Sequence, residues 1–251
     1  MADQRARNLS RELELDGSIQ AAARILVERL RVGAVRPERA WLAGYLGHGP
    51  AALAVGVVPH AVGNDLRFLE EWLQGFASVG REAWVRAALA VTRAARDELR
   101  RIGRAQTRSL RSAIGAACAW AECPCDEHAR QARILPIGDR PDPQDPVATA
   151  HEAATACLRA IGEPDPGQHA LLALQRGHAV ATLVSQEAVE RRRHRALRRR
   201  EGRFTWHEGQ RLGLVVDAVR DELIPWLLAE RDPIAGELSN PLPLGAQAQR
   251  S

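Results

Sequence analysis

The 251-residue chain has no lysine, so all 35 residues of the Lys+Arg total are arginine. Aromatic residues make up only 4 %, and no apolar run approaches the ~18 residues that a membrane-spanning helix needs. Residues 1–18, MADQRARNLSRELELDGS, are polar and charged and lack the apolar centre of a secretory signal. We therefore expect a cytoplasmic protein with no membrane segment, whose four cysteines are reduced thiols and not a disulfide scaffold.

The balance of charged and apolar residues excludes a disordered chain. Hydrophobic residues account for 45 % and charged residues for 26 %, which is enough apolar material for a core. The net charge is only +4, and Arg alternates with Asp and Glu through most of the chain. Such alternation is typical of solvated helix faces and not of a nucleic-acid surface.

Apolar residues recur at helical spacing, and the alternation typical of strands is nearly absent. Because Gly or Pro separates several short helices, the sequence predicts an all-α fold, an irregular bundle of stacked helical hairpins. A repeat-like layout stays an open alternative, since no strict solenoid period is found. The predicted helices are 18–31, 37–47, 50–55, 64–76, 81–102, 105–121, 147–161, one from about 168 into an arginine run, and one from 205 that Pro225 should kink or shorten.

A proline-rich segment at 136–146, PIGDRPDPQDP, interrupts the helices because repeated prolines deny helix to themselves and to their predecessors. It is a linker between two helical regions or a loop on one helical body. The predicted organisation is an N-terminal helical region (1–135), the linker or loop (136–146), a C-terminal helical region (147–232) and a flexible tail (233–251).

Four residues of the stretch CAWAECPCDEH have side chains that bind zinc in other proteins: Cys118, Cys123, Cys125 and His128. One residue separates Cys123 from Cys125, whereas two to four are usual between zinc ligands. Cys118 also lies on an apolar stripe, where cysteine acts as a small hydrophobe. We therefore expect a proline-broken helix end with incidental thiols and no bound metal or cofactor.

Motifs of known catalytic classes are absent from the sequence. There is no Gly-x-Ser-x-Gly, His-Glu-x-x-His, Walker loop or Gly-x-Gly-x-x-Gly, and the eight histidines are scattered. The sequence therefore gives no support to an enzyme.

Residues 191–203, RRRHRALRRREGR, which we call the arginine run, contain eight arginines and one acid, Glu201. Arginine binds carboxylates of a protein partner with paired hydrogen bonds, and it also binds phosphates of nucleic acids. A third alternative is a solvated helix end whose charge favours the helix dipole. The candidate partner-binding residues are Arg191, Arg192, Arg193, Arg195, Arg198, Arg199, Arg200 and Trp206.

The six tryptophans divide into two groups. The predicted apolar stripes include Trp41, Trp72, Trp84 and Trp120, which we expect in the core. Trp206 lies at a predicted helix start and Trp226 follows a proline, and we expect either of them to anchor a contact between helices or a partner surface.

Residues 111–120, RSAIGAACAW, resemble a motif of alanine-rich helical immunity proteins found beside bacterial polymorphic toxins. That motif reads Arg-x-Ala-Ile-Glu-Ala-Ala-x-Ala-Trp, and the matching residues are Arg111, Ala113, Ile114, Ala116, Ala117, Ala119 and Trp120. The chain departs from it at Gly115, where the family has Glu, and at Leu110, where Pro is usual. Segments 38–56 and 221–233 are similar to large helical paralogue sets of GC-rich soil bacteria, particularly myxobacteria.

The resemblance implies a non-catalytic protein that binds a partner. Together with the absent catalytic motifs it favours a helical interaction protein, with neutralisation of a toxin by occlusion as one such role. The alternatives are a nucleic-acid-binding regulator acting through the arginine run and a zinc protein or enzyme that uses residues 118–128.

Overall fold

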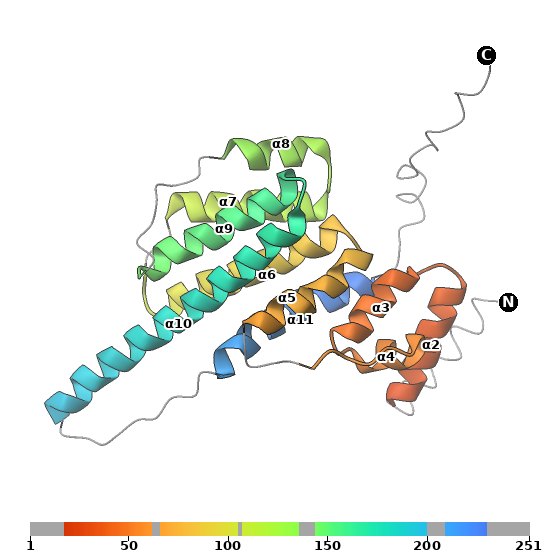
Figure 1. Cartoon of the computed structure of the whole chain (residues 1–251), viewed down its shortest axis with the longest axis horizontal. Coiled ribbons are helices and arrows are strands. Elements are labelled where there is room, and N and C mark those ends of the chain that lie inside the picture. The colour runs from red at the N-terminus through yellow and green to blue at the C-terminus, as the bar shows by residue number, and fades with distance from the viewer. Residues whose placement is uncertain (1–17, 62–65, 105–106, 136–143, 200–208, 230–251) are drawn as a thin grey trace, which may run out of the picture.

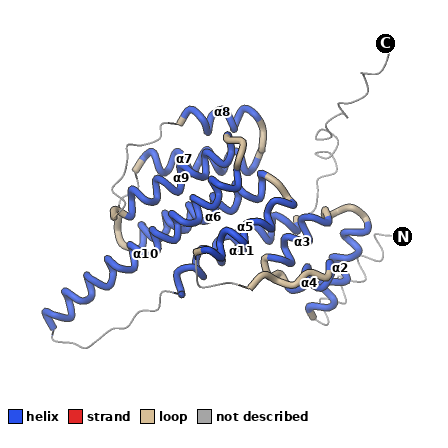
Figure 2. The backbone as a smooth tube through the Cα atoms, in the orientation of Figure 1, coloured by secondary structure: helices blue, strands red, loops and turns tan. Residues whose placement is uncertain are grey.

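The computed structural model describes residues 18–61, 66–104, 107–135, 144–199 and 209–229, and side chains are described outside 188–199 and 209–211. Within these ranges the fold is all-α, as predicted, and Figure 2 shows helices and loops with no strand in the described chain. None of these helices is both long and apolar enough to cross a bilayer. The helices are α2 (Ile19–Arg31), α3 (Pro37–Tyr45), α4 (Gly49–Val55), α5 (Arg67–Gln74), the 3-10 helix η1 (Gly75–Ser78), α6 (Arg81–Arg101), α7 (Arg108–Glu122), α8 (Asp126–Ile134), α9 (Pro146–Gly162), α10 (Pro166–Arg199) and α11 (Gly209–Leu228).

The short N-terminal helices begin and end at the residues that their capping signals predict. The Ser18 hydroxyl accepts a hydrogen bond from the Ala21 N–H at 3.1 Å and caps α2. Pro37 lies in the first turn of α3, where its missing N–H costs nothing. Gly56 follows α4 in the left-handed conformation, with φ 68°. Helical spacing places Ile19 on one face of α2 with Leu26, which is buried, but Ile19 itself is 52 % exposed.

Helix α6 lies at the centre of the molecule and packs against α7, α9, α10 and α11 (Figure 1). Its Ala83, Ala87 and Val91 belong to a first core, which also holds the large buried residues of α3, α5 and α11. Its Val85 and Leu89 belong to a second core, shared with α7, α9 and α10. Both cores therefore combine helices from before and after the proline-rich segment.

The few aromatic residues are concentrated in the first core. Neighbouring rings follow one another from Trp41 through Trp72 to Trp84, with centroids 5.2–6.0 Å apart. Trp72 and Trp120 are buried, whereas Trp41 and Trp84 are half-buried and pack against the cores. The prediction of core positions is confirmed for Trp72 and Trp120, whereas Trp41 and Trp84 lie at the edge of the cores.

The proline-rich segment ends at α9, where Pro146 takes the first helical position and the Asp145 carboxylate accepts the Val147 N–H at 3.2 Å. Residues 136–143 lie outside the described chain, as does the predicted tail 233–251. Helix α11 continues to Leu228 through Pro225, so it extends three residues beyond this proline. Its predicted start at Thr205 lies outside the described residues.

Helix α8 has no counterpart among the helices predicted from the sequence. Residues 123–128 are expected to form a broken helix end, but the break is confined to the Cys123–Pro124–Cys125 loop. A new helix begins at Asp126 and buries only Ala129 and Ala132. Nine residues with two buried alanines give no clear apolar stripe, so periodicity does not detect this helix.

Candidate functional site

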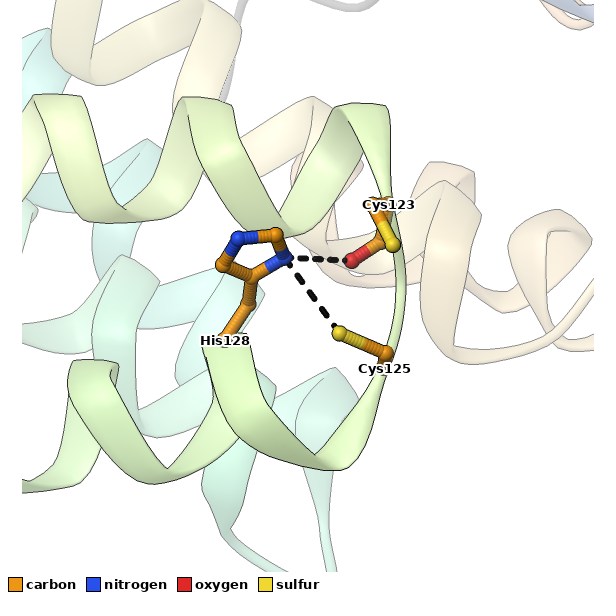
Figure 3. A group of neighbouring side chains, drawn as sticks. All are labelled: Cys123, Cys125 and His128. Atoms are coloured by element: carbon orange, nitrogen blue, oxygen red, sulfur yellow. Dashed lines mark hydrogen bonds between the residues drawn. The ribbon is translucent and has the colours of Figure 1, made fainter.

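The loop between α7 and α8 positions three side chains that can ligate a metal: Cys123, Cys125 and His128 (Figure 3). We call these residues the Cys/His cluster. Cys123 ends α7 and Cys125 caps α8, and both have extended backbone, with φ −135° and −124°. An extended conformation is what Pro124 favours in the residue before it. The Cys125 N–H donates a hydrogen bond to the Cys123 carbonyl at 2.8 Å, which closes a γ-turn about Pro124 and brings the two cysteines together.

His128 is the third helical residue of α8, a position whose side chain reaches back toward the capping residue. Its Nδ1 lies 3.0 Å from the Cys123 carbonyl oxygen and 3.4 Å from Cys125 Sγ. All three ligand atoms of the Cys/His cluster lie within 4.8 Å of one another. The structure thus brings together three of the four residues that the sequence singled out.

The electrostatics of the Cys/His cluster distinguish its two thiols. The backbone of His128 in the first turn of α8 lowers the pKa of Cys125, and the Cys123 thiol and the imidazole lower it further. The hydrogen bond to Cys125 raises the pKa of Cys123. The carbonyl of Cys123 and the Cys125 thiolate raise the pKa of His128. Cys125 is therefore the thiol that ionises first.

Cys118, the fourth candidate, is outside the Cys/His cluster. It is half-buried, and Arg93 Nη2 of α6 donates a hydrogen bond to its Sγ at 3.0 Å. The same guanidinium donates to Glu222 of α11 at 2.9 Å. Burial lowers the pKa of Arg93, but its bonds to Cys118 and Glu222 outweigh this and raise it. Cys118 thus helps to join α7 to α6 and is not placed to share a metal with Cys123 and Cys125.

The structure describes only a portion of the arginine run. The backbone of α10 stays helical through Arg199, and its last turns extend away from the other helices (Figure 1). Arg200 and Trp206 lie outside the described residues. The candidates on this helical extension are Arg191, Arg192, Arg193, Arg195, Arg198 and Arg199.

Trp226 anchors a contact between helices, one of the two roles expected from the sequence. The Arg39 guanidinium lies 4.2 Å from the centre of its ring, and that of Arg86 lies 4.6 Å from it. Arg86 and Arg93 both pair with Glu222, at 3.6 and 2.9 Å. This group, which links α3, α6 and α11, has no local sequence signal because its members are far apart in the chain.

The residues that carry the resemblance to immunity proteins lie in α7. Ile114, Ala117 and Trp120 are buried in the second core, whereas Arg111 is exposed. Comparison with protein-family models, with curated proteins and with solved structures finds no match to this chain.

Proposed function

We propose that the protein is a non-catalytic interaction protein of the cytoplasm that uses the arginine-bearing end of α10 to bind an acidic surface of a protein partner. In this proposal it is an immunity protein, and binding neutralises a toxin by covering it. The observation that carries the proposal is the helical extension of α10 beyond the body (Figure 1).

The last buried side chain described on α10 is that of Ser185. Residues 188–199 continue as helix for about 18 Å at 1.5 Å per residue. This segment contains six arginines and one acid, Glu190. A helical, strongly basic projection suits an acidic groove on a partner, since a helix that is already formed loses little conformational entropy on binding.

Charge pairing on the body favours a protein partner over nucleic acid. A phosphate-binding surface recruits arginines from several elements. In the described chain many body arginines pair with acids, as Arg176 does with Glu152 at 2.7 Å and Arg104 with Glu187 at 3.2 Å. No other helix in the described part of the chain carries arginines as densely as residues 191–199 of α10, and one such element is too little for tight, sequence-specific binding to a duplex.

A polar cavity of about 650 Å³ lies near the base of the extension, lined by Arg104, Gln144, Leu183 and Glu187 among others. It adds a concave polar surface beside the arginines. An acidic partner that contacts the arginine run has room to place a loop there.

The experiment uses the full chain and the product of the adjacent gene, mixed at ~0.15 M salt in a calorimeter. We expect binding, and we expect the triple variant Arg195→Ala, Arg198→Ala, Arg199→Ala to weaken it at least ~10-fold, about 1.4 kcal/mol. A second triple variant, Arg31→Ala, Arg100→Ala, Arg130→Ala, removes the same charge from exposed positions elsewhere. It should change the Kd less than ~3-fold.

Equal losses in the two triple variants would show that net charge alone drives binding, and would overturn the role of α10. A parallel titration with duplex DNA tests the alternative function, a nucleic-acid-binding regulator. Sub-micromolar, sequence-dependent binding to the duplex that the α10 variant abolishes would establish a nucleic-acid-binding regulator in place of an immunity protein.

A further inference from the structure

We propose that Cys123, Cys125 and His128 form a binding site for one thiophilic d10 cation, Zn²⁺ or Cu⁺, at the junction of α7 and α8. The site is independent of the arginine run. It revises the expectation of incidental thiols, which rested on the one-residue spacing between Cys123 and Cys125.

The single residue between Cys123 and Cys125 is compatible with a metal site, given the local backbone conformation. The Cys125 N–H donates to the Cys123 carbonyl at 2.8 Å, so the chain turns tightly about Pro124. With this turn the two thiols and the imidazole lie within 4.8 Å of one another despite the single intervening residue. Tetrahedral zinc, with bonds of about 2.3 Å to sulfur and 2.0–2.1 Å to nitrogen, places its ligand atoms roughly 3.5–3.8 Å apart. The observed 3.4 Å between Cys125 Sγ and His128 Nδ1, and the limit of 4.8 Å for the whole cluster, need only small rotamer changes.

The chemistry of the three donors selects the ion. Two thiolates and an imidazole are soft or borderline ligands, which favour Zn²⁺ and Cu⁺ over Mg²⁺ and Ca²⁺. Three protein ligands complete the trigonal coordination of Cu⁺, whereas Zn²⁺ would take a water as its fourth ligand. Both ions use the same donors.

Binding releases protons because both thiols must ionise, and the neutral imidazole of His128 must carry its proton on Nε2 so that Nδ1 is free for the ion. The proton at Nδ1 leaves the Cys123 carbonyl that it contacts at 3.0 Å. The bound ion would tie Cys123, the residue that follows α7, to the first turn of α8.

The test uses the reduced full chain, stripped of metal with a chelator and titrated with Co²⁺, Zn²⁺ and Cu⁺ in separate experiments. We expect one ion per chain, thiolate-to-cobalt charge-transfer absorption, and proton release on binding. Cys125→Ser and His128→Ala should each weaken binding at least ~100-fold, since losing a second-shell partner alone costs 10–100-fold. Competition between Zn²⁺ and Cu⁺ for the same chain decides which ion the site prefers.

Cys118→Ser is the matched control, because it changes a cysteine of the same stretch that hydrogen-bonds Arg93 outside the cluster. It should bind like the parent chain. A stoichiometry well below one ion per chain for both Zn²⁺ and Cu⁺, or unchanged binding in Cys125→Ser, would overturn the proposal. So would equal alkylation of Cys123 and Cys125 with and without the ion, since a bound ion protects both thiols.

Discussion

Gly177 of α10 lies directly against Val91 of α6, and a Cβ at Gly177 would overlap Val91 Cγ1. Val91 is fully buried in the first core. The absence of a side chain at Gly177 is what lets the two helices approach this closely. The contact joins the longest helix to the central one.

Gly177→Ala should destabilise the protein by about 1–3 kcal/mol, because α10 must move away from α6 to admit the methyl group. Urea unfolding measures this loss. Gly115 of α7 provides the control, since a Cβ there meets nothing within 4 Å. Gly115→Ala should stabilise by about 0.5–1 kcal/mol through helix propensity alone. A neutral Gly177→Ala would contradict the close packing.

Glu222→Gln should destabilise by about 1–2 kcal/mol, because it removes the charge that Arg86 and Arg93 share. The Glu222 side chain is only 24 % exposed, so water compensates little. Thermal and urea unfolding measure the effect. Trp226 fluorescence offers no specific readout, since the chain has six tryptophans.

Asp97→Asn is the matched control for Glu222, since Asp97 also pairs with two arginines, Arg96 and Arg100. Its side chain is 56 % exposed, and the loss should stay below ~0.5 kcal/mol. If Glu222→Gln and Asp97→Asn lower the free energy of unfolding equally, burial does not strengthen the ion pairs of Glu222.

Stability should fall with acid below about pH 6.5, and His151 contributes to this fall. Burial lowers the pKa of His151, and Asp145 offsets some of that shift. As the pH falls, the unfolded chain then binds more protons than the native chain. The contribution of His151 to the free energy of unfolding is therefore complete above about pH 6.5 and decreases below it. His48, whose pKa burial also lowers, acts in the same direction.

His151→Gln should therefore reduce the pH dependence of the urea midpoint between about pH 7.5 and 5.5. His128, whose pKa is raised, is present in both proteins, so the difference between them isolates His151. A variant with an unchanged slope would show that His151 has the same pKa in the native and unfolded chains.

The four thiols should differ sharply in reaction with iodoacetamide near neutral pH. Cys125 should react fastest, since its pKa is lowered, whereas burial raises the pKa of Cys157 to about 12. Peptide mass spectrometry after timed alkylation gives the rates. Cys157 should become modified only when the protein unfolds, and rapid native labelling of it would contradict its place in the second core.

Local signals predict most of the helices. Ser18, Pro37 and the proline-rich segment each act on the backbone within a few residues, so the sequence places these boundaries correctly. The thiols of the Cys/His cluster are also visible, since they are close in sequence. What spacing alone does not reveal is the tight turn about Pro124, which the hydrogen bond from the Cys125 N–H to the Cys123 carbonyl closes and which brings the two cysteines together.

Contacts between distant helices leave no such signal. The pairing of Arg93 with Cys118 and Glu222 spans α6, α7 and α11, and each partner alone resembles an ordinary surface or stripe residue. Gly177 is likewise a single glycine within a helix. Only the position of Val91 on α6 explains why a side chain is not tolerated there. Tertiary packing determines both, and periodicity describes one helix at a time.

Helix α6 contributes residues to both cores, because Ala87 packs in the first core and Leu89 in the second. Melting either core removes the packing surface of its neighbour, so the two cores should lose structure together in one cooperative transition. Heat denaturation should then give a calorimetric enthalpy equal to the van't Hoff enthalpy. A chain cut inside the 136–143 segment should likewise reassemble from its two fragments, because α6 lies in the first fragment and α9, α10 and α11, which pack along it, lie in the second.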